Sequence, residues 1–110
     1  MIPAAPKLDA VTLMEGGLLM AFFASSLTVT TTEAAIPQPS TSDSHAGLHV
    51  ELNNTGSETV YIGGPGVTTT TGTPVPAGEQ WYMDNMWPSD IPYVITSAGS
   101  STLSILWTGV

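Results

Sequence analysis

Two histidines flanked by carboxylates come closest, by type and spacing, to a metal site in this chain. His45 and His49 are four positions apart, with Asp43 and Glu51 beside them. On a helix this spacing would place both imidazoles on one face. Residues 48–52 instead alternate apolar and polar side chains, which predicts a strand. On a strand the two histidines would lie about 13 Å apart, at about 3.3 Å per residue. We therefore expect solvent-facing side chains and no metal site, unless a symmetric oligomer brings copies of one histidine together.

A second candidate for chemistry is a pair of aspartates. Asp84 and Asp90 flank a Trp-Pro loop and could act as the acid and base of a glycoside hydrolase. Loop aspartates far more often form turns, and nothing else in the chain supports an enzyme. There is no cysteine and no Gly-x-Ser-x-Gly nucleophile elbow, and GGPG at residues 63–66 lacks the lysine of a P-loop. We expect no catalytic residues and no cofactor.

The charge balance restricts the partners that this chain can bind. Lys7 is the single basic side chain against nine carboxylates, which gives a formal net charge of −8 over 110 residues. Nucleic acids and anionic membranes are both bound through Lys and Arg, so neither is an expected partner. Only 9% of the residues are charged, against about 25% in an ordinary soluble domain. Either a Thr/Ser-rich β surface covers the exterior, or neighbouring chains bury part of it.

Residues 16–24, GGLLMAFFA, resemble the apolar core of a signal peptide. Glu15 precedes them and no positive segment does, so we expect neither a signal peptide nor a membrane span.

Turn residues recur between short apolar segments along most of the chain. Pro3 and Pro6 predict an extended N-terminal arm over residues 1–7. The first strands are expected within residues 8–34, notably Leu18–Ala24, buried on both faces, and Leu27–Thr32. Residues 35–47 read as a linker or loop.

Residues 48–110 show the clearest strand pattern. Short strands with turns between them predict a single all-β domain, either a small β-sandwich or a jelly-roll-like barrel. The Gly/Pro-rich segment that follows the expected strand at residues 60–62 is expected to be a rigid loop, with Thr68–Thr71 in extended geometry. We expect strands at 48–52, 60–62, 80–83, 93–96 and 103–107.

The same half of the chain resembles small virion accessory proteins of tailed bacteriophages. The likeness is carried by VYIGGPGVTTTTGTPVPAGEQW and IPYVITSAGSSTLSILW and spans about residues 48–107. It implies a head decoration (cement) or head-fibre-like protein with no catalytic residues. The decoration reading places the chain on the outer surface of the phage head, bound to the major capsid protein and to copies of itself as a homotrimer. Two alternatives stay open: a carbohydrate-binding β-sandwich of a fibre or tail tip, and a head–tail connector or tail subunit.

The candidate contacts come from the N-terminal arm, from two loops, and from the apolar run LLMAFF, which is either a core strand or a strand exchanged between subunits. Trp107 and Trp81 are predicted to be core residues, whereas Trp87 lies in a loop and could contact a partner. In the carbohydrate alternative, Trp81, Tyr82 or Trp87 would stack on sugar rings. The candidate protein interface comprises Ile2, Pro3, Leu18, Leu19, Phe22, Phe23, Pro65, Val67 and Trp87.

Overall fold

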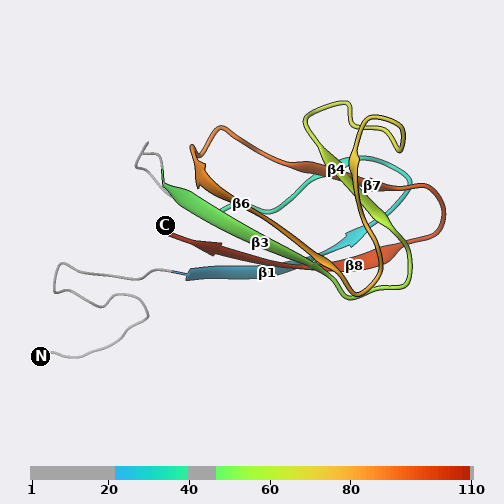
Figure 1. The fold of residues 1–110 in the computed structure, drawn as a ribbon, viewed down its shortest axis with the longest axis horizontal. Coiled ribbons are helices and arrows are strands. Elements are labelled where there is room, and N and C mark those ends of the chain that lie inside the picture. The colour runs from blue at the N-terminus through green and yellow to red at the C-terminus, as the bar shows by residue number, and fades with distance from the viewer. Residues whose placement is uncertain (1–21, 40–46, 110) are drawn as a thin grey trace, which may run out of the picture.

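The computed structural model describes residues 22–39 and 47–109, which form two packed antiparallel sheets of four strands each (Figure 1). The first sheet has the order β1-β8-β3-β6 and the second β2-β7-β4-β5. The all-β prediction is confirmed, and of its two architectures the sandwich is the one observed. The described residues contain no helix, hence none that could span a membrane. The strands are β1 (Phe22–Val29), β2 (Ala34–Ala35), β3 (Leu48–Asn54), β4 (Val60–Gly63), β5 (Thr73–Val75), β6 (Gln80–Met86), β7 (Tyr93–Thr96) and β8 (Ser101–Thr108).

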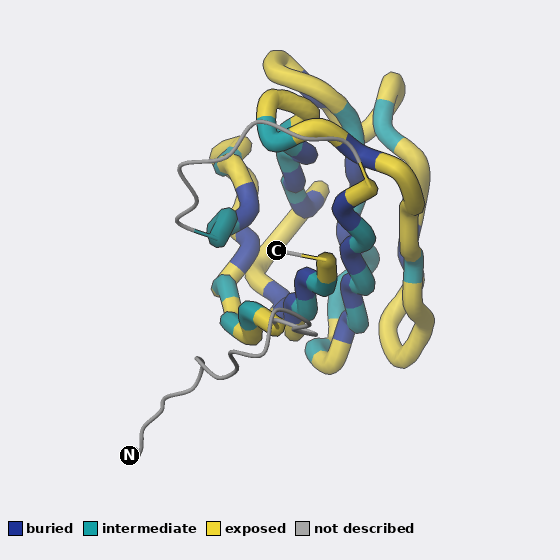
Figure 2. Tube along the Cα trace, turned by 90° about the vertical axis from the view of Figure 1, so that its left-hand side faces the viewer, coloured by how far each residue is buried: buried dark blue, intermediate teal, exposed yellow. Residues whose placement is uncertain are grey.

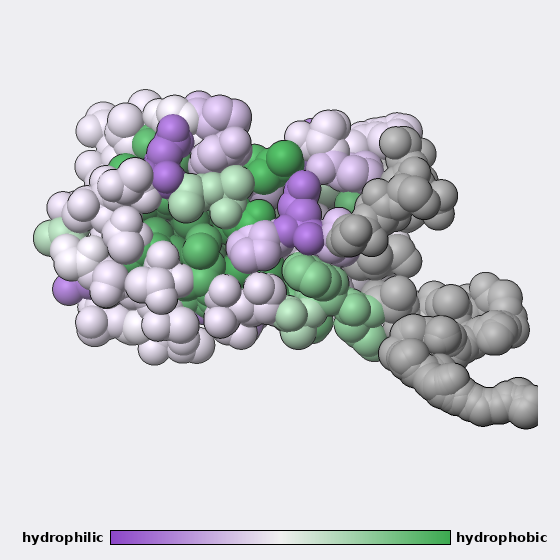
Figure 3. Space-filling view, turned by 180° about the vertical axis from the view of Figure 1, so that it is seen from behind, coloured by the Kyte–Doolittle hydropathy of each residue, from purple (hydrophilic) through white to green (hydrophobic). Residues whose placement is uncertain are grey.

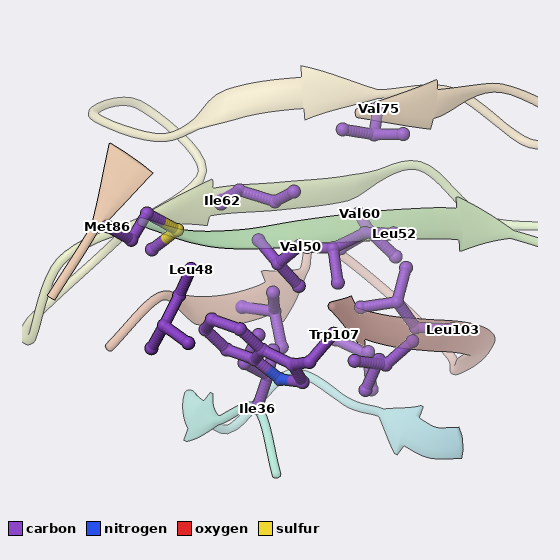
Figure 4. Packing of buried hydrophobic residues seen from close by; sticks show 13 residues of the cluster. Ile36, Leu48, Val50, Leu52, Val60, Ile62, Val75, Met86, Leu103 and Trp107 are labelled. Atoms are coloured by element: carbon purple, nitrogen blue, oxygen red, sulfur yellow. The ribbon is translucent and has the colours of Figure 1, made fainter. Parts of the chain in front are cut away.

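The core lies between the two sheets, and the inner strands β3 and β8 supply much of it (Figures 2 and 4). Every second residue of β3 is buried, and β8 alternates in the same way. Trp107 is fully buried among these residues, and its indole Nε1 donates a 2.9 Å hydrogen bond to the carbonyl of Pro37. The prediction that Trp107 belongs to the core is confirmed. Trp81 is only partly buried, packed against the edge of the core.

The first strand differs from the sequence prediction. Two strands were expected, but β1 runs continuously through Ser25 and Ser26 and pairs with β8 in unbroken register. Its side chains alternate between exposed and partly buried, so the described part of Leu18–Ala24 is not buried on both faces. The reason is that only one face of each sheet packs against the other sheet, so the outer face of β1 is exposed, and at the edge of the sandwich its inner face is covered only in part. Residues 1–21, which include the predicted arm, lie outside the described residues.

The described part of the predicted linker is structured. Ala34 and Ala35 pair with β7, and Ile36 is buried while its amide donates to the carbonyl of Pro92. The bond from Trp107 to Pro37 fixes the next residue to the core. This segment therefore packs along the sandwich as part of it, while residues 40–46 of the predicted linker lie outside the description.

A buried asparagine joins the two sheets at one end of the sandwich. Asn54, the last residue of β3, donates through Nδ2 to the carbonyls of Glu58 and Val75, at 2.7 and 2.8 Å. Its Oδ1 accepts from the Ser101 hydroxyl at 2.6 Å and from the Gly56 amide at 3.2 Å. All four hydrogen-bonding positions of the side chain are used, so the buried amide is fully satisfied.

Candidate interaction surfaces

The predicted interface residues that the structure describes lie in separate places. Phe22 is exposed (62%) on the outer face of β1, while Phe23, on the opposite face, packs against the core. Trp87 is half exposed (50%) just after β6. Pro65 lies exposed in the loop that follows β4. Four further residues of the predicted interface lie outside the described residues: Ile2, Pro3, Leu18 and Leu19.

The loop between β4 and β5 is closed on Val67, which corrects the prediction for that residue. Val67 is only 6% exposed, and its side chain packs against the positions of Gly63 and Gly72. A Cβ on either glycine would lie within 3.0 Å of Val67 Cγ2, so the loop can close this tightly only with glycine there. Val67 thus fills the interior of its own loop and exposes little surface for a contact.

The threonines of this loop form a turn, where extended geometry was expected. Thr68 Oγ1 accepts from the amides of Thr70 and Thr71, and Thr71 Oγ1 accepts from the amide of Thr68. The Gly72 amide closes the turn by donating to the carbonyl of Thr68 at 2.9 Å. Threonine hydroxyls capture nearby backbone amides in this way, and here that local bonding prevails over the β-propensity.

An apolar groove of about 390 Å³ lies between β6 and the facing ends of β4 and β7. Trp81, Met83 and Met86 of β6 line one side, and Ile62 and Tyr93 line the other. Pro65 and the chain between β6 and β7 complete the rim, where Asp90 is the one ionisable acid among the lining residues. The groove therefore suits an apolar or aromatic group more than a charged one.

A β-bulge in β6 shapes this groove. Leu48 pairs with Met86 and Val50 with Met83, so Asp84 and Asn85 both stand opposite His49. Asn85 has a φ of 57°, in the left-handed region that asparagine tolerates better than most residues. The extra residue lets Met86 point inward and be buried although Met83 also lines the groove.

The outer face of the first sheet brings together a polar cluster that the sequence did not predict as a unit. His49 Nδ1 donates to Asp84 Oδ1 across the strand pair, and His49 Nε2 lies 3.7 Å from Glu51 Oε2. The ring of Tyr82, which is 63% exposed, lies 5.9 Å from the imidazole between centroids. His49 and Glu51 share the polar face of a strand as predicted, but Asp84 is 35 residues away in sequence and reaches them only through strand pairing.

The described residues form neither a complete metal site nor a complete acid/base pair of a glycoside hydrolase. In the described part of the chain, no group of three or more metal-ligating residues is arranged to hold an ion. His45 and Asp43 lie outside that part. Asp90 Oδ2 accepts from the Trp87 amide at 2.9 Å, as a turn-forming aspartate does, while Asp84 is paired with His49.

Figure 3 shows a surface consistent with the low charge of the sequence. On the face opposite to the view of Figure 1, most described groups are weakly polar, a few are strongly hydrophilic, and apolar groups gather in a central hollow. Comparison with known proteins found no family model that matches this chain and no curated protein similar to it.

Proposed function

We propose that this protein is a structural component of a bacteriophage virion that binds the outer surface of the head and stabilises the capsid. The virion assignment rests on the resemblance of residues 48–107 to phage accessory proteins. The structural observation that supports a protein-binding role is the exposure of large side chains, Phe22, Tyr82, Met83 and Trp87, on a surface poor in charge. Aromatic side chains of this kind are enriched among the residues that dominate binding energy at protein interfaces.

The net charge of −8 favours the outside of the head over its interior. A packaged genome is densely anionic and would repel a chain whose only basic residue is Lys7. On the outer face, acidic side chains can pair with basic groups of the major capsid protein at the rim of a contact. Repeated weak contacts over a symmetric shell would add through avidity.

The groove and Trp87 form the surface best suited to the capsid. Trp87 directly follows Met86, which lines the groove, and Pro65 stands exposed on its rim. A side chain of the shell protein inserted there would bury apolar area from both partners. Since a stable contact needs on the order of 1,000 Å² of buried surface, the groove would be its centre and the loops around it the remainder.

Two measurements test the decoration role. A quantified gel of purified particles should show a copy number close to that of the major shell protein, whereas a connector would be present in far fewer copies. Purified protein should also bind heads that lack it and raise their resistance to heat. Trp87→Ala should weaken that binding, while Ser104→Ala, on the exposed outer face of β8 and outside the groove lining, should leave it unchanged. Failure of the wild-type protein to bind heads that lack it would overturn the proposal.

The groove also supports a second candidate function, the binding of carbohydrate. The aromatic residues Trp81 and Tyr93 line it, together with the polar residues Ser89 and Asp90. Sugar rings stack on such aromatic faces while their hydroxyls bond to neighbouring polar atoms. Quenching of tryptophan fluorescence by host polysaccharide, abolished in Trp81→Leu and retained in Trp87→Phe, would favour this function over decoration.

A further inference from the structure

The outer strands of the two sheets differ in how well they are protected against pairing with another strand. An edge strand exposes unpaired backbone groups, and proteins block such edges with short strands, proline, charge or bulges. In the second sheet, β2 has only two residues, and β5 has three with Pro74 at its centre. In the first sheet, β6 carries the bulge at Asp84 and Asn85, with the exposed carboxylate of Asp84 upon it. Each of these three edges therefore has a recognisable block.

The fourth edge, β1, has none of these features. It runs for eight residues, FFASSLTV, in continuous register with β8, and among the described residues no strand pairs with its other side. It contains no proline and no ionisable side chain, although the chain as a whole carries a net charge of −8. Alternate residues of such a strand direct both N–H and C=O toward the free side.

We propose that β1 is a self-association edge, at which two copies of this chain pair their β1 strands antiparallel across a twofold axis. Of the two long edge strands, β6 carries the carboxylate of Asp84, which would repel the same group of an identical molecule, whereas β1 carries no charge and can face a second copy of itself. Small side chains at Ser25 and Ser26, in the middle of the strand, allow close approach at the axis. The two first sheets then form one continuous sheet.

The partly buried side chains of β1 fit this arrangement. Phe23 and Leu27 lie on its inner face, packed against the core at the edge of the sandwich but not enclosed by it. In antiparallel pairing centred on Ser25, Phe23 stands opposite Leu27 of the partner subunit, and the symmetry repeats this contact. The pairing would thus bury apolar side chains that one chain alone leaves partly open.

A twofold pair is favoured over the trimer that the phage resemblance implies. In a ring, β1 of one copy would have to meet a different edge of the next copy. The other described edges are the short, proline-containing and bulged ones, which are poor partners for an eight-residue strand. Among the edges of residues 22–39 and 47–109, antiparallel self-pairing is the one arrangement that joins β1 to an equally long and unblocked edge. This inference concerns the isolated protein and does not depend on its binding to a phage head.

Sedimentation equilibrium of the purified full-length protein gives the first test. We expect a mass twice that of the 11.4 kDa chain. Ser26→Lys, which places two ammonium groups near the twofold axis, should shift the protein to monomer without changing its circular dichroism. Ser104→Lys is the matched control, since Ser104 is the exposed residue paired with Ser26 one strand further in, and it should remain dimeric. A monomeric or trimeric wild type, or a dimer that persists in Ser26→Lys, would overturn the inference.

Single cysteines give a second, independent test, because the natural chain has none. Across the axis, the two copies of residue 26 would lie about 5 to 8 Å apart, whether directly opposite or diagonal. The two copies of residue 104 would be about 14 Å apart, at three strand spacings. A bis-maleimide whose span lies between these distances should join Ser26→Cys into dimers and leave Ser104→Cys uncoupled. Equal coupling of both variants, or of neither, would contradict pairing at β1.

Discussion

In the first sheet, the inner strands β3 and β8 differ from the outer strands β1 and β6 in how far their side chains are buried. In β3 and β8 every second side chain is buried, and the side chains between them are exposed or partly buried on the outer face. In β1 and β6 only Val29 and Met86, at the strand ends, are buried. The inner pair therefore supplies the packing that stabilises the fold, whereas the outer pair supplies the surfaces that remain for other molecules. Substitutions should separate these roles.

The largest effect on stability is expected from Trp107, at the centre of the inner pair. Trp107→Ala removes the largest fully buried side chain and the donor to Pro37, and should lower the free energy of unfolding by about 4 kcal/mol. Domains have unfolding free energies of about 5 to 15 kcal/mol, so that loss is a large fraction of the stability. Trp87→Ala removes the same side chain from a half-exposed site and should cost less than about 1 kcal/mol. Urea unfolding followed by circular dichroism measures the unfolding free energies of both variants. Similar losses for the two would contradict the assignment of packing to the inner strands and of binding surfaces to the outer ones.

The polar end of β3 should have the next largest effect. Asn54→Leu keeps the approximate volume but leaves the carbonyls of Glu58 and Val75, the Ser101 hydroxyl and the Gly56 amide without their partner. Each buried group left unsatisfied costs about 1 to 3 kcal/mol, and partial hydration limits the sum, so we expect a loss of about 3 kcal/mol.

The neighbouring Asn53 is the control for that experiment. Its side chain points to the outer face and accepts only an exposed hydrogen bond from Gln80. Asn53→Ala should change the unfolding free energy by less than about 0.5 kcal/mol. If thermal or urea unfolding shows equal losses for the two variants, the buried network does not stabilise the junction of the sheets.

The inner strands were also the part of the fold that the sequence predicted best. Alternation over residues 48–52 and 103–107 is a local signal, and it gave the strands, their buried faces and the core position of Trp107. The strand character of Ser25 and Ser26 has no such signal, because it depends on pairing with Ile105 and Ser104 of β8, about 80 residues away along the chain. Long-range pairing likewise brings Asp84 to His49, which spacing along the chain could not reveal.

The candidate surfaces were less predictable than the fold. Trp87 was predicted to be a loop residue that could contact a partner, and it is half exposed. Phe22 was an interface candidate within a strand expected to be buried on both faces, and it is exposed. Val67 was misassigned because its burial depends on the turn that the threonine hydroxyls form around it. The groove arises from the bulge in β6, whose only trace in the sequence is an asparagine able to adopt a positive φ.

The smallest effect, and the sharpest contrast between the two outer strands, is expected at that asparagine. Asn85→Val places a β-branched residue at a φ of 57° and should lower the free energy of unfolding by about 1 to 2 kcal/mol. Asn85→Gly, which relieves the same backbone constraint, should be neutral within about 0.5 kcal/mol. In the straight strand, Thr28→Val introduces the same side chain at an exposed position and should also be neutral. Equal losses of unfolding free energy for Thr28→Val and Asn85→Val would mean that the bulge does not hold Asn85 in a left-handed conformation in solution. Without that bulge, β6 would be as open as β1 to pairing with another strand.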